Sequence, residues 1–159
     1  MASRFTLVTD IDAPPAAVFD LARNIGAHVA SMTPSGESAI GGVTTGLIRL
    51  GEEVTFRARH FGVWFTMTAR IVEMTPPERF VDEQTRGPFR RFRHEHRFEP
   101  SPSGGTTMTD TIELASPVLG KAVERLLLVP YLRRVIAGRN AVLAASIRPS
   151  APDEERPLP

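Results

Sequence analysis

The feature that most constrains the fold is a change in apolar spacing late in the chain. From residue 53 to residue 115, apolar and β-branched side chains recur mainly at every second position. After residue 117 the spacing becomes helical. Period two is typical of strands and period 3.6 of helices. With turns at Gly62, Pro76-Pro77 and Gly87-Pro88, the sequence predicts an antiparallel meander of about six strands. One long helix follows, from 118 to about 147, which Pro130 should kink or break.

The first 35 residues add one strand and two short helices. Alternation from Phe5 to Ile11 predicts the strand, and Pro14-Pro15 suits the first turn of a helix that ends near Gly26. A second helix is expected from about His28 to Met32. A curved antiparallel sheet of this kind can wrap around the last helix and bury one face of every strand against it. The order of elements therefore predicts an α+β fold with a cavity between the sheet and the long C-terminal helix.

Composition sets the remaining limits. At 159 residues, 42% hydrophobic and 23% charged, the chain has room for one domain, expected over residues 1–148. Residues 149–159 are rich in proline and acid and are expected to be a disordered tail. The chain has no cysteine, which excludes disulfides and thiolate chemistry. It shows no signal peptide and no apolar run long enough to span a bilayer, so we expect a cytoplasmic protein without membrane insertion.

Basic residues gather in one segment although the net charge is only +1. Five arginines lie between residues 86 and 97, interspersed with Glu95 and, just beyond, Glu99. Such a pattern can mark a nucleic-acid surface. Because the acids alternate with the arginines, a solvated strand face is favoured, and no nucleic-acid partner is expected.

The stretch FRHEHRF, residues 92–98, carries the candidate site. Alternate positions separate Phe92, His94, His96 and Phe98 from three charged residues, so the two histidines share the apolar face. On the last strand Asp110 shares a face with Met108 and Ile112. A short hairpin joins the two strands, so Asp110 should lie opposite or diagonal to one of the histidines.

The preceding strand is ambiguous in its orientation. Phe80, Asp82 and Gln84 share one face, which we take as inward, whereas Val81 favours the other. A bulge near Gly87-Pro88 would permit either parity.

The predicted cavity therefore has a polar cluster in an apolar lining. The cluster comprises Asp82, Gln84, His94, His96 and Asp110, with His60 as a further member. The expected ligand contacts add Phe92, Phe98, Met108, Ile112, Leu127 and Tyr131. Three interpretations of the cluster are open. It can be a structural hydrogen-bond network, an acid–base or ligand-recognition site with His94, His96 and Asp110 as catalytic groups, or a metal triad. Because His-x-His is common by chance, neither a metal nor a cofactor is predicted.

Three stretches resemble a known superfamily. IDAPPAAVFDLARN is similar to the opening strand and first helix of the START and Bet v 1-like (SRPBCC) superfamily, and GGTTMTDTIELASP to its closing strand. FVDEQTRGPFRRFRHEHRFEP resembles the F-x-D-x-Q, G-P, H-x-H, F pattern of a bacterial ligand-binding subfamily among polyketide cyclase/dehydrase-like proteins. The resemblance covers about residues 4–147. It implies the helix-grip fold and a ligand cavity.

These observations leave three functional hypotheses. The first is binding of a small hydrophobic or aromatic molecule, lipid- or polyketide-like, in the internal cavity. The second is a cofactor-free polyketide cyclase or dehydratase that uses the cavity histidines and aspartate as general acid and base. The third is a protein-interaction module, which predicts a filled interior and an exposed apolar patch. The sequence does not decide whether the protein is an enzyme, or whether it is a monomer or a homodimer.

Overall fold

The computed structural model describes residues 2–117 and 120–147. The predicted tail at 149–159 lies outside these residues. The predicted series of one strand, two short helices, six strands and a C-terminal helix is confirmed. The fold is the α+β helix-grip arrangement.

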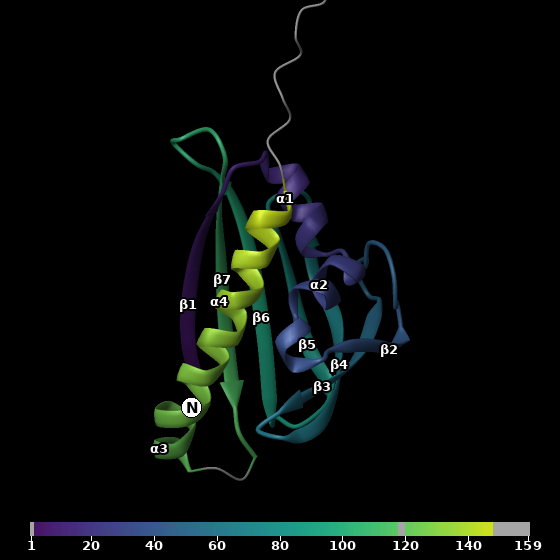
Figure 1. Ribbon diagram of the computed structural model, residues 1–159, viewed down its shortest axis with the longest axis vertical. Helices are drawn as coiled ribbons and strands as arrows, with labels where there is room; N and C mark the ends of the chain where they lie inside the picture. The colour runs from purple at the N-terminus through teal and green to yellow at the C-terminus, as the bar shows by residue number, and fades with distance from the viewer. Residues whose placement is uncertain (1, 118–119, 148–159) are drawn as a thin grey trace, which may run out of the picture.

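Seven antiparallel strands form one sheet in the order β1-β7-β6-β5-β4-β3-β2 (Figure 1). Their bounds are β1 Ser3–Ile11, β2 Ser38–Gly42, β3 Glu53–His60, β4 Val63–Thr75, β5 Arg79–Arg86, β6 Arg91–Pro100 and β7 Thr106–Ala115. Strands β2 to β7 are a meander of neighbours, and β1 joins the sheet by pairing with β7. The meander therefore brings β5, β6 and β7, the three strands of the predicted site, side by side.

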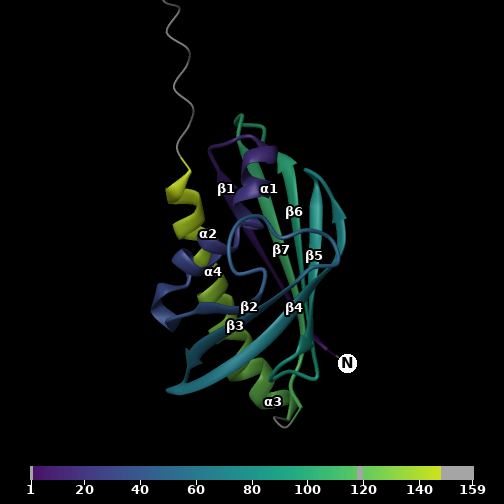
Figure 2. The same cartoon turned by 90° about the vertical axis from the view of Figure 1, so that its right-hand side faces the viewer.

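The helices all lie on one face of this sheet (Figures 1 and 2). Their bounds are α1 Pro15–Ala22, α2 Ile25–Ser31, a 3₁₀ turn at Thr33–Ser35, α3 Lys121–Val123, a π-helical turn at Glu124–Leu128, and α4 Val129–Ser146. Figure 2 shows β3 and β4 crossing at a steep angle to β6 and β7, which gives the sheet a strong twist. Helix α4 runs across the inner face of the sheet, and the interior of the protein lies between this helix and the sheet.

The helix after α1 begins earlier than predicted. The Oδ1 of Asn24 accepts a hydrogen bond of 3.0 Å from the N–H of Ala27, so Asn24 caps a helix that starts at Ile25. Gly26, expected to end the first helix, lies inside α2 instead. Glycine is common at helix ends, which is why the pattern predicted an end at Gly26.

The C-terminal helix passes Pro130 without ending. The expected start at residue 118 lies outside the described residues, and the helix is seen from Lys121. The π-helical turn directly before α4 places Pro130 in the first turn of a new α-helical segment. Proline is tolerated there because the ring clashes with a carbonyl only in a regular helix interior. The helix therefore accommodates Pro130 through one wider, π-helical turn.

The core leaves a space under α4. Phe19 of α1 packs edge-on against Phe80 and Phe98, with ring centroids 5.7 and 5.5 Å apart. A second cluster joins Ile136 of α4 to Phe5 and other buried residues of β1, β6 and β7. Each such side chain contributes about 1.5–3 kcal/mol by burial. Between sheet and helix remains a cavity of about 430 Å³.

Among residues 2–117 and 120–147, no helix combines the length and the apolar character needed to cross a bilayer.

Candidate functional site

The cavity is apolar over most of its surface. Strand β3 contributes Phe56 and Ala58, strand β4 contributes Met67, and helix α4 contributes Leu132 and Ile136, among others. Its volume of about 430 Å³ lies within the range of small-molecule sites, roughly 300–1,000 Å³. A space of this size is available to a ligand with several rings or a short acyl chain.

Half of the predicted site residues line this cavity. They are His60, Asp82, Phe92, His94, His96 and Tyr131. Asp82 is therefore inward, and with it the face of β5 that carries Phe80, which resolves the ambiguity of this strand. The remaining six predicted residues lie elsewhere: Gln84, Phe98, Met108, Asp110, Ile112 and Leu127.

Most of these six support the wall from behind. Phe98, Met108 and Ile112 are buried in the two core clusters. Gln84 closes the turn between β5 and β6, because its Nε2 donates to the carbonyl of Phe89 at 2.7 Å. Packing around these side chains leaves none of them on the cavity surface.

Leu127 was placed wrongly. The residue is 64% exposed and lies on the outer side of the C-terminal helix. The buried positions of α4 include Ile136 and Leu143, and stepping back by three or four residues from Ile136 leads through Leu132 to Leu128. The π-helical turn breaks the regular spacing on which the prediction relied, and Leu128 lines the cavity in place of Leu127.

The two histidines are held by one buried aspartate. Asp110 lies opposite His96 in the register of β6 and β7, and its side chain has no solvent exposure. The Nε2 of His94 donates to Asp110 Oδ1 at 2.8 Å. Since no described residue bonds to the other ring nitrogen of His94, its Nδ1 is a free acceptor on the cavity wall.

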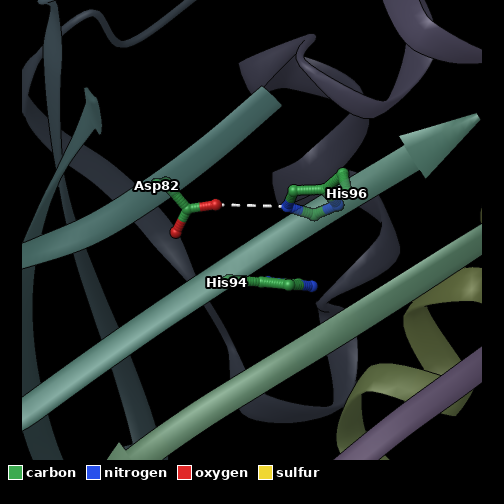
Figure 3. A group of neighbouring side chains, drawn as sticks. All are labelled: Asp82, His94 and His96. Atoms are coloured by element: carbon green, nitrogen blue, oxygen red, sulfur yellow. Dashed lines mark hydrogen bonds and ion pairs between the residues drawn. The ribbon is translucent and has the colours of Figure 1, made fainter. Parts of the chain in front are cut away.

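His96 stands between two carboxylates. Its Nε2 donates to Asp82 Oδ2 at 3.1 Å, the contact drawn in Figure 3. Its Nδ1 lies 2.9 Å from Asp110 Oδ1, close enough for an ion pair but without the angle of a hydrogen bond. Both ring nitrogens thus face negative oxygens, which is the environment of an imidazolium.

The pKa values of the two rings move in opposite directions. Burial lowers the pKa of His94 below its ordinary 6.5, and the neighbouring His96 lowers it further. Burial also disfavours the charge on His96, but contacts with Asp110 and Asp82 outweigh it and raise the pKa of His96. For Asp110 burial acts to raise the pKa, yet the two imidazoles hold it well below its usual range. As the pH falls, His96 is therefore protonated before His94, and the opposite shifts favour a pair of one neutral and one protonated imidazole.

Helix α4 supplies two further members of the network, neither of which is among the predicted site residues. Asn140 Nδ2 donates to Asp110 Oδ2 at 2.7 Å. The Nη1 of Arg139 lies 3.6 Å from Asp110 Oδ1, and Arg139 lines the cavity although it is only 3% exposed. A signal was present, because residues 139 and 140 share the helical face of Ile136 and Leu143. Polar residues on that stripe indicate a buried partner on the sheet.

The opposite side of the cavity has polar residues as well. His60 and Tyr131 are joined by a hydrogen bond, and His28 and Glu37 by another. Neither His28 nor Glu37 is among the predicted site residues. Both line the cavity because α2 and the start of β2 fold over the end of β3.

A metal site is possible in composition but poorly formed. Among the described residues, Asp82, His94 and His96 offer ligand atoms within 4.8 Å of one another. However, the two imidazoles lie nearly face to face, with centroids 3.8 Å apart and planes 33° apart, and do not converge on one point (Figure 3). Each Nε2 is also bound to a carboxylate, and Arg139 adds positive charge. The arrangement fits a hydrogen-bond network better than a cation.

Comparison with solved structures shows the same fold at low identity. The protein TTHA0849 from Thermus thermophilus is 16% identical, with a TM-score of 0.70 over 92% of this chain and 100% of that one. Zhui aromatase/cyclase from Streptomyces sp. R1128 is 13% identical, with a TM-score of 0.73 over 92% and 93%. Ginseng major latex-like protein 151 from Panax ginseng is 15% identical, with a TM-score of 0.68 over 92% and 97%.

No curated protein matches the sequence significantly. The family model described as "Polyketide cyclase / dehydrase and lipid transport" matches residues 2–148, almost the whole chain. Together with the aromatase/cyclase and latex-like folds, this match confirms the superfamily indicated by the sequence. The chain belongs to the polyketide cyclase/dehydrase and lipid transport family.

Proposed function

We propose that this protein binds a small, largely apolar molecule in the cavity under α4, with the polar end of the ligand at Asp82, His94 and Arg139. The observation that supports this proposal is the cavity itself. Its volume is about 430 Å³, its lining is mainly apolar, and one free imidazole nitrogen lies on its wall. Burying an apolar ligand there is favourable, and the polar groups orient it. The interaction-module hypothesis predicted a filled interior, whereas the structure has a cavity.

Ligand binding is tested by filling the cavity. Ala58 on β3 is buried and lines it, so Ala58→Phe should occupy the space a ligand needs. Val8 is exposed on β1, and Val8→Phe adds the same ring outside the cavity. Titration calorimetry with hydroxybiphenyl, which carries one para hydroxyl, should show at least about tenfold weaker binding for Ala58→Phe and unchanged binding for Val8→Phe. Equal affinity in both variants would contradict binding in the cavity.

A second candidate, acid–base catalysis, is favoured by the His94–Asp110 pair. Asp110 fixes the tautomer in which Nε2 of His94 carries the proton and Nδ1 is the base. That nitrogen is placed to take a proton from a carbon next to a carbonyl group. The resulting enolate carbon would bond to a second carbonyl carbon of the same molecule, and the proton would pass to the new alkoxide. This is the first step of an aldol cyclisation.

The catalytic candidate has its own test. Deuterium exchange into α-tetralone, followed by NMR, reports proton abstraction without requiring the natural substrate. Wild-type protein should accelerate the exchange, and His94→Gln should abolish the acceleration while retaining hydroxybiphenyl binding within a few-fold. Exchange at the same rate with and without protein would leave binding as the function and remove the catalytic one.

A further inference from the structure

The cavity has a second group of polar side chains, on the side of β3 and far from His94. His60 Nδ1 and Tyr131 Oη are 2.7 Å apart, and their rings meet edge to face. Glu37 Oε1 lies 2.6 Å from His28 Nε2, and its side chain is 8% exposed. All four line the cavity. We call these residues, His28, Glu37, His60 and Tyr131, the β3 pole.

The hydrogen bond between His60 and Tyr131 leaves one donor unused. Burial lowers the pKa of His60 and raises that of Tyr131, so the pair is neutral imidazole and neutral phenol. The phenol O–H is a stronger hydrogen-bond donor than the imidazole N–H, so it donates to Nδ1, and the imidazole proton is then on Nε2. No described residue accepts from this Nε2–H.

An apolar strand surface separates the two polar groups. His60 belongs to β3 and His94 to β6, three strands apart, which corresponds to roughly 14 Å across the sheet. Between them the inner face of β4 presents Met67, Ala69 and Ile71. A ligand with a polar group at one end only would leave the other pole without a partner.

We infer that the β3 pole binds an oxygen atom at the far end of the ligand, through His60 Nε2–H. The ligand is accordingly an elongated ring compound with neutral oxygen substituents, hydroxyl or carbonyl, at both ends. The carboxylate of Glu37 beside this pole disfavours an anionic end. This inference rests on the proposed binding function, and it adds the ligand class and the residue that selects it.

The test compares two matched ligands. Dihydroxybiphenyl, with a hydroxyl at both para positions, differs from hydroxybiphenyl only in the group meant for the β3 pole. Titration calorimetry on wild-type protein should show about 3- to 10-fold tighter binding of dihydroxybiphenyl, the gain from one hydrogen bond. His60→Leu should remove the preference. His60→Gln should retain it, because the amide nitrogen of glutamine occupies nearly the position of the imidazole Nε2.

The outcomes separate this inference from the function on which it rests. Equal affinity of the two ligands for wild type, or a preference that persists in His60→Leu, would overturn the β3 pole and leave cavity binding intact. Binding of neither ligand, nor of unsubstituted biphenyl, would overturn both. His60 lies half-buried at the end of β3, so both variants should fold, which circular dichroism and the melting temperature verify.

Discussion

Asp110 is the residue on which the polar network depends. It contacts His94, His96 and Asn140 from a position without solvent exposure, with Arg139 close by. A carboxylate so enclosed orients other groups and does not touch a ligand itself. Its predicted catalytic role is therefore better described as positioning of His94.

Asp110→Asn should be costly for stability. The amide keeps the shape but removes the negative charge that compensates His96 and Arg139, so we expect a loss of about 3 kcal/mol in the free energy of unfolding. Asp10→Asn, on the exposed side of β1, is the matched control and should change it by less than about 0.5 kcal/mol. Urea unfolding measures both. Equally small effects of the two substitutions would show that the network contributes little to the free energy of unfolding.

Opposite pKa shifts predict a maximum of stability near pH 6.5. Below this pH the unfolded chain binds protons that the folded His94 and His60 resist, so the free energy of unfolding falls as the pH falls. Above it the folded His96 keeps a proton that the unfolded chain loses, so the free energy falls again as the pH rises. Urea unfolding between pH 5 and pH 9 tests this. His96→Gln should flatten the alkaline side; an unchanged alkaline slope would assign the proton elsewhere.

At the scale of elements, β2 ends in a glycine with a left-handed backbone conformation. Gly42 ends it with a φ of 68°, and a Cβ there would lie 2.1 Å from the carbonyl oxygen of Glu53 on β3. Gly46 has a similar φ of 74°, but a Cβ there would meet nothing within 4 Å. Both glycines need the left-handed region, and only Gly42 also needs the space.

The two alanine variants separate these requirements. Gly46→Ala should cost about 1 kcal/mol, the penalty of a left-handed alanine. Gly42→Ala should cost at least about 3 kcal/mol, because β2 must move away from β3 as well. Thermal or urea unfolding gives both values. A cost for Gly42→Ala no larger than that for Gly46→Ala would mean that the β2 edge yields easily.

Local sequence patterns predicted most helices and strands, and each wrong prediction has a physical cause. Alternation located β6 and β7, and turn residues separated the strands, because both signals act within a few residues. The start of α2 was predicted too late because Gly26 is typical of a helix end, whereas Asn24 caps a helix that begins directly after it. Leu127 was predicted on the wrong side of the last helix because the prediction assumed regular α-helical spacing. The π-helical turn at Glu124–Leu128 changes this spacing.

At the scale of the whole molecule, the sequence could place the site on β5, β6 and β7 but could not complete it. Register predicted that Asp110 would face the histidines. Arg139 and Asn140 reach Asp110 from a helix about thirty residues further along, and Glu37 reaches the cavity through a loop. Such contacts depend on how the helices dock on the sheet. Pairing rules within a sheet carry no information about this.

Ion pairs on the outer face engage Arg93 and Arg97 of the arginine-rich segment. Arg93 contacts Glu73 on β4 and Glu83 on β5 at 3.1 and 3.2 Å, and Arg97 contacts Glu95 at 3.0 Å. These arginines therefore have acidic partners on their own sheet, as the alternating sequence indicated. The charged face and the cavity lie on opposite sides of the same strands, so each strand serves both surfaces.

The central claim is that a ligand sits in the cavity against His94. Nuclear Overhauser effects between hydroxybiphenyl and the protein measure this directly, because they report protons within a few ångströms of each other. The account predicts effects from the ligand to the imidazole protons of His94 and to the side chains of Phe92 and Ile136. Effects confined to exposed side chains such as Leu126 and Trp64, with none to His94, would contradict it.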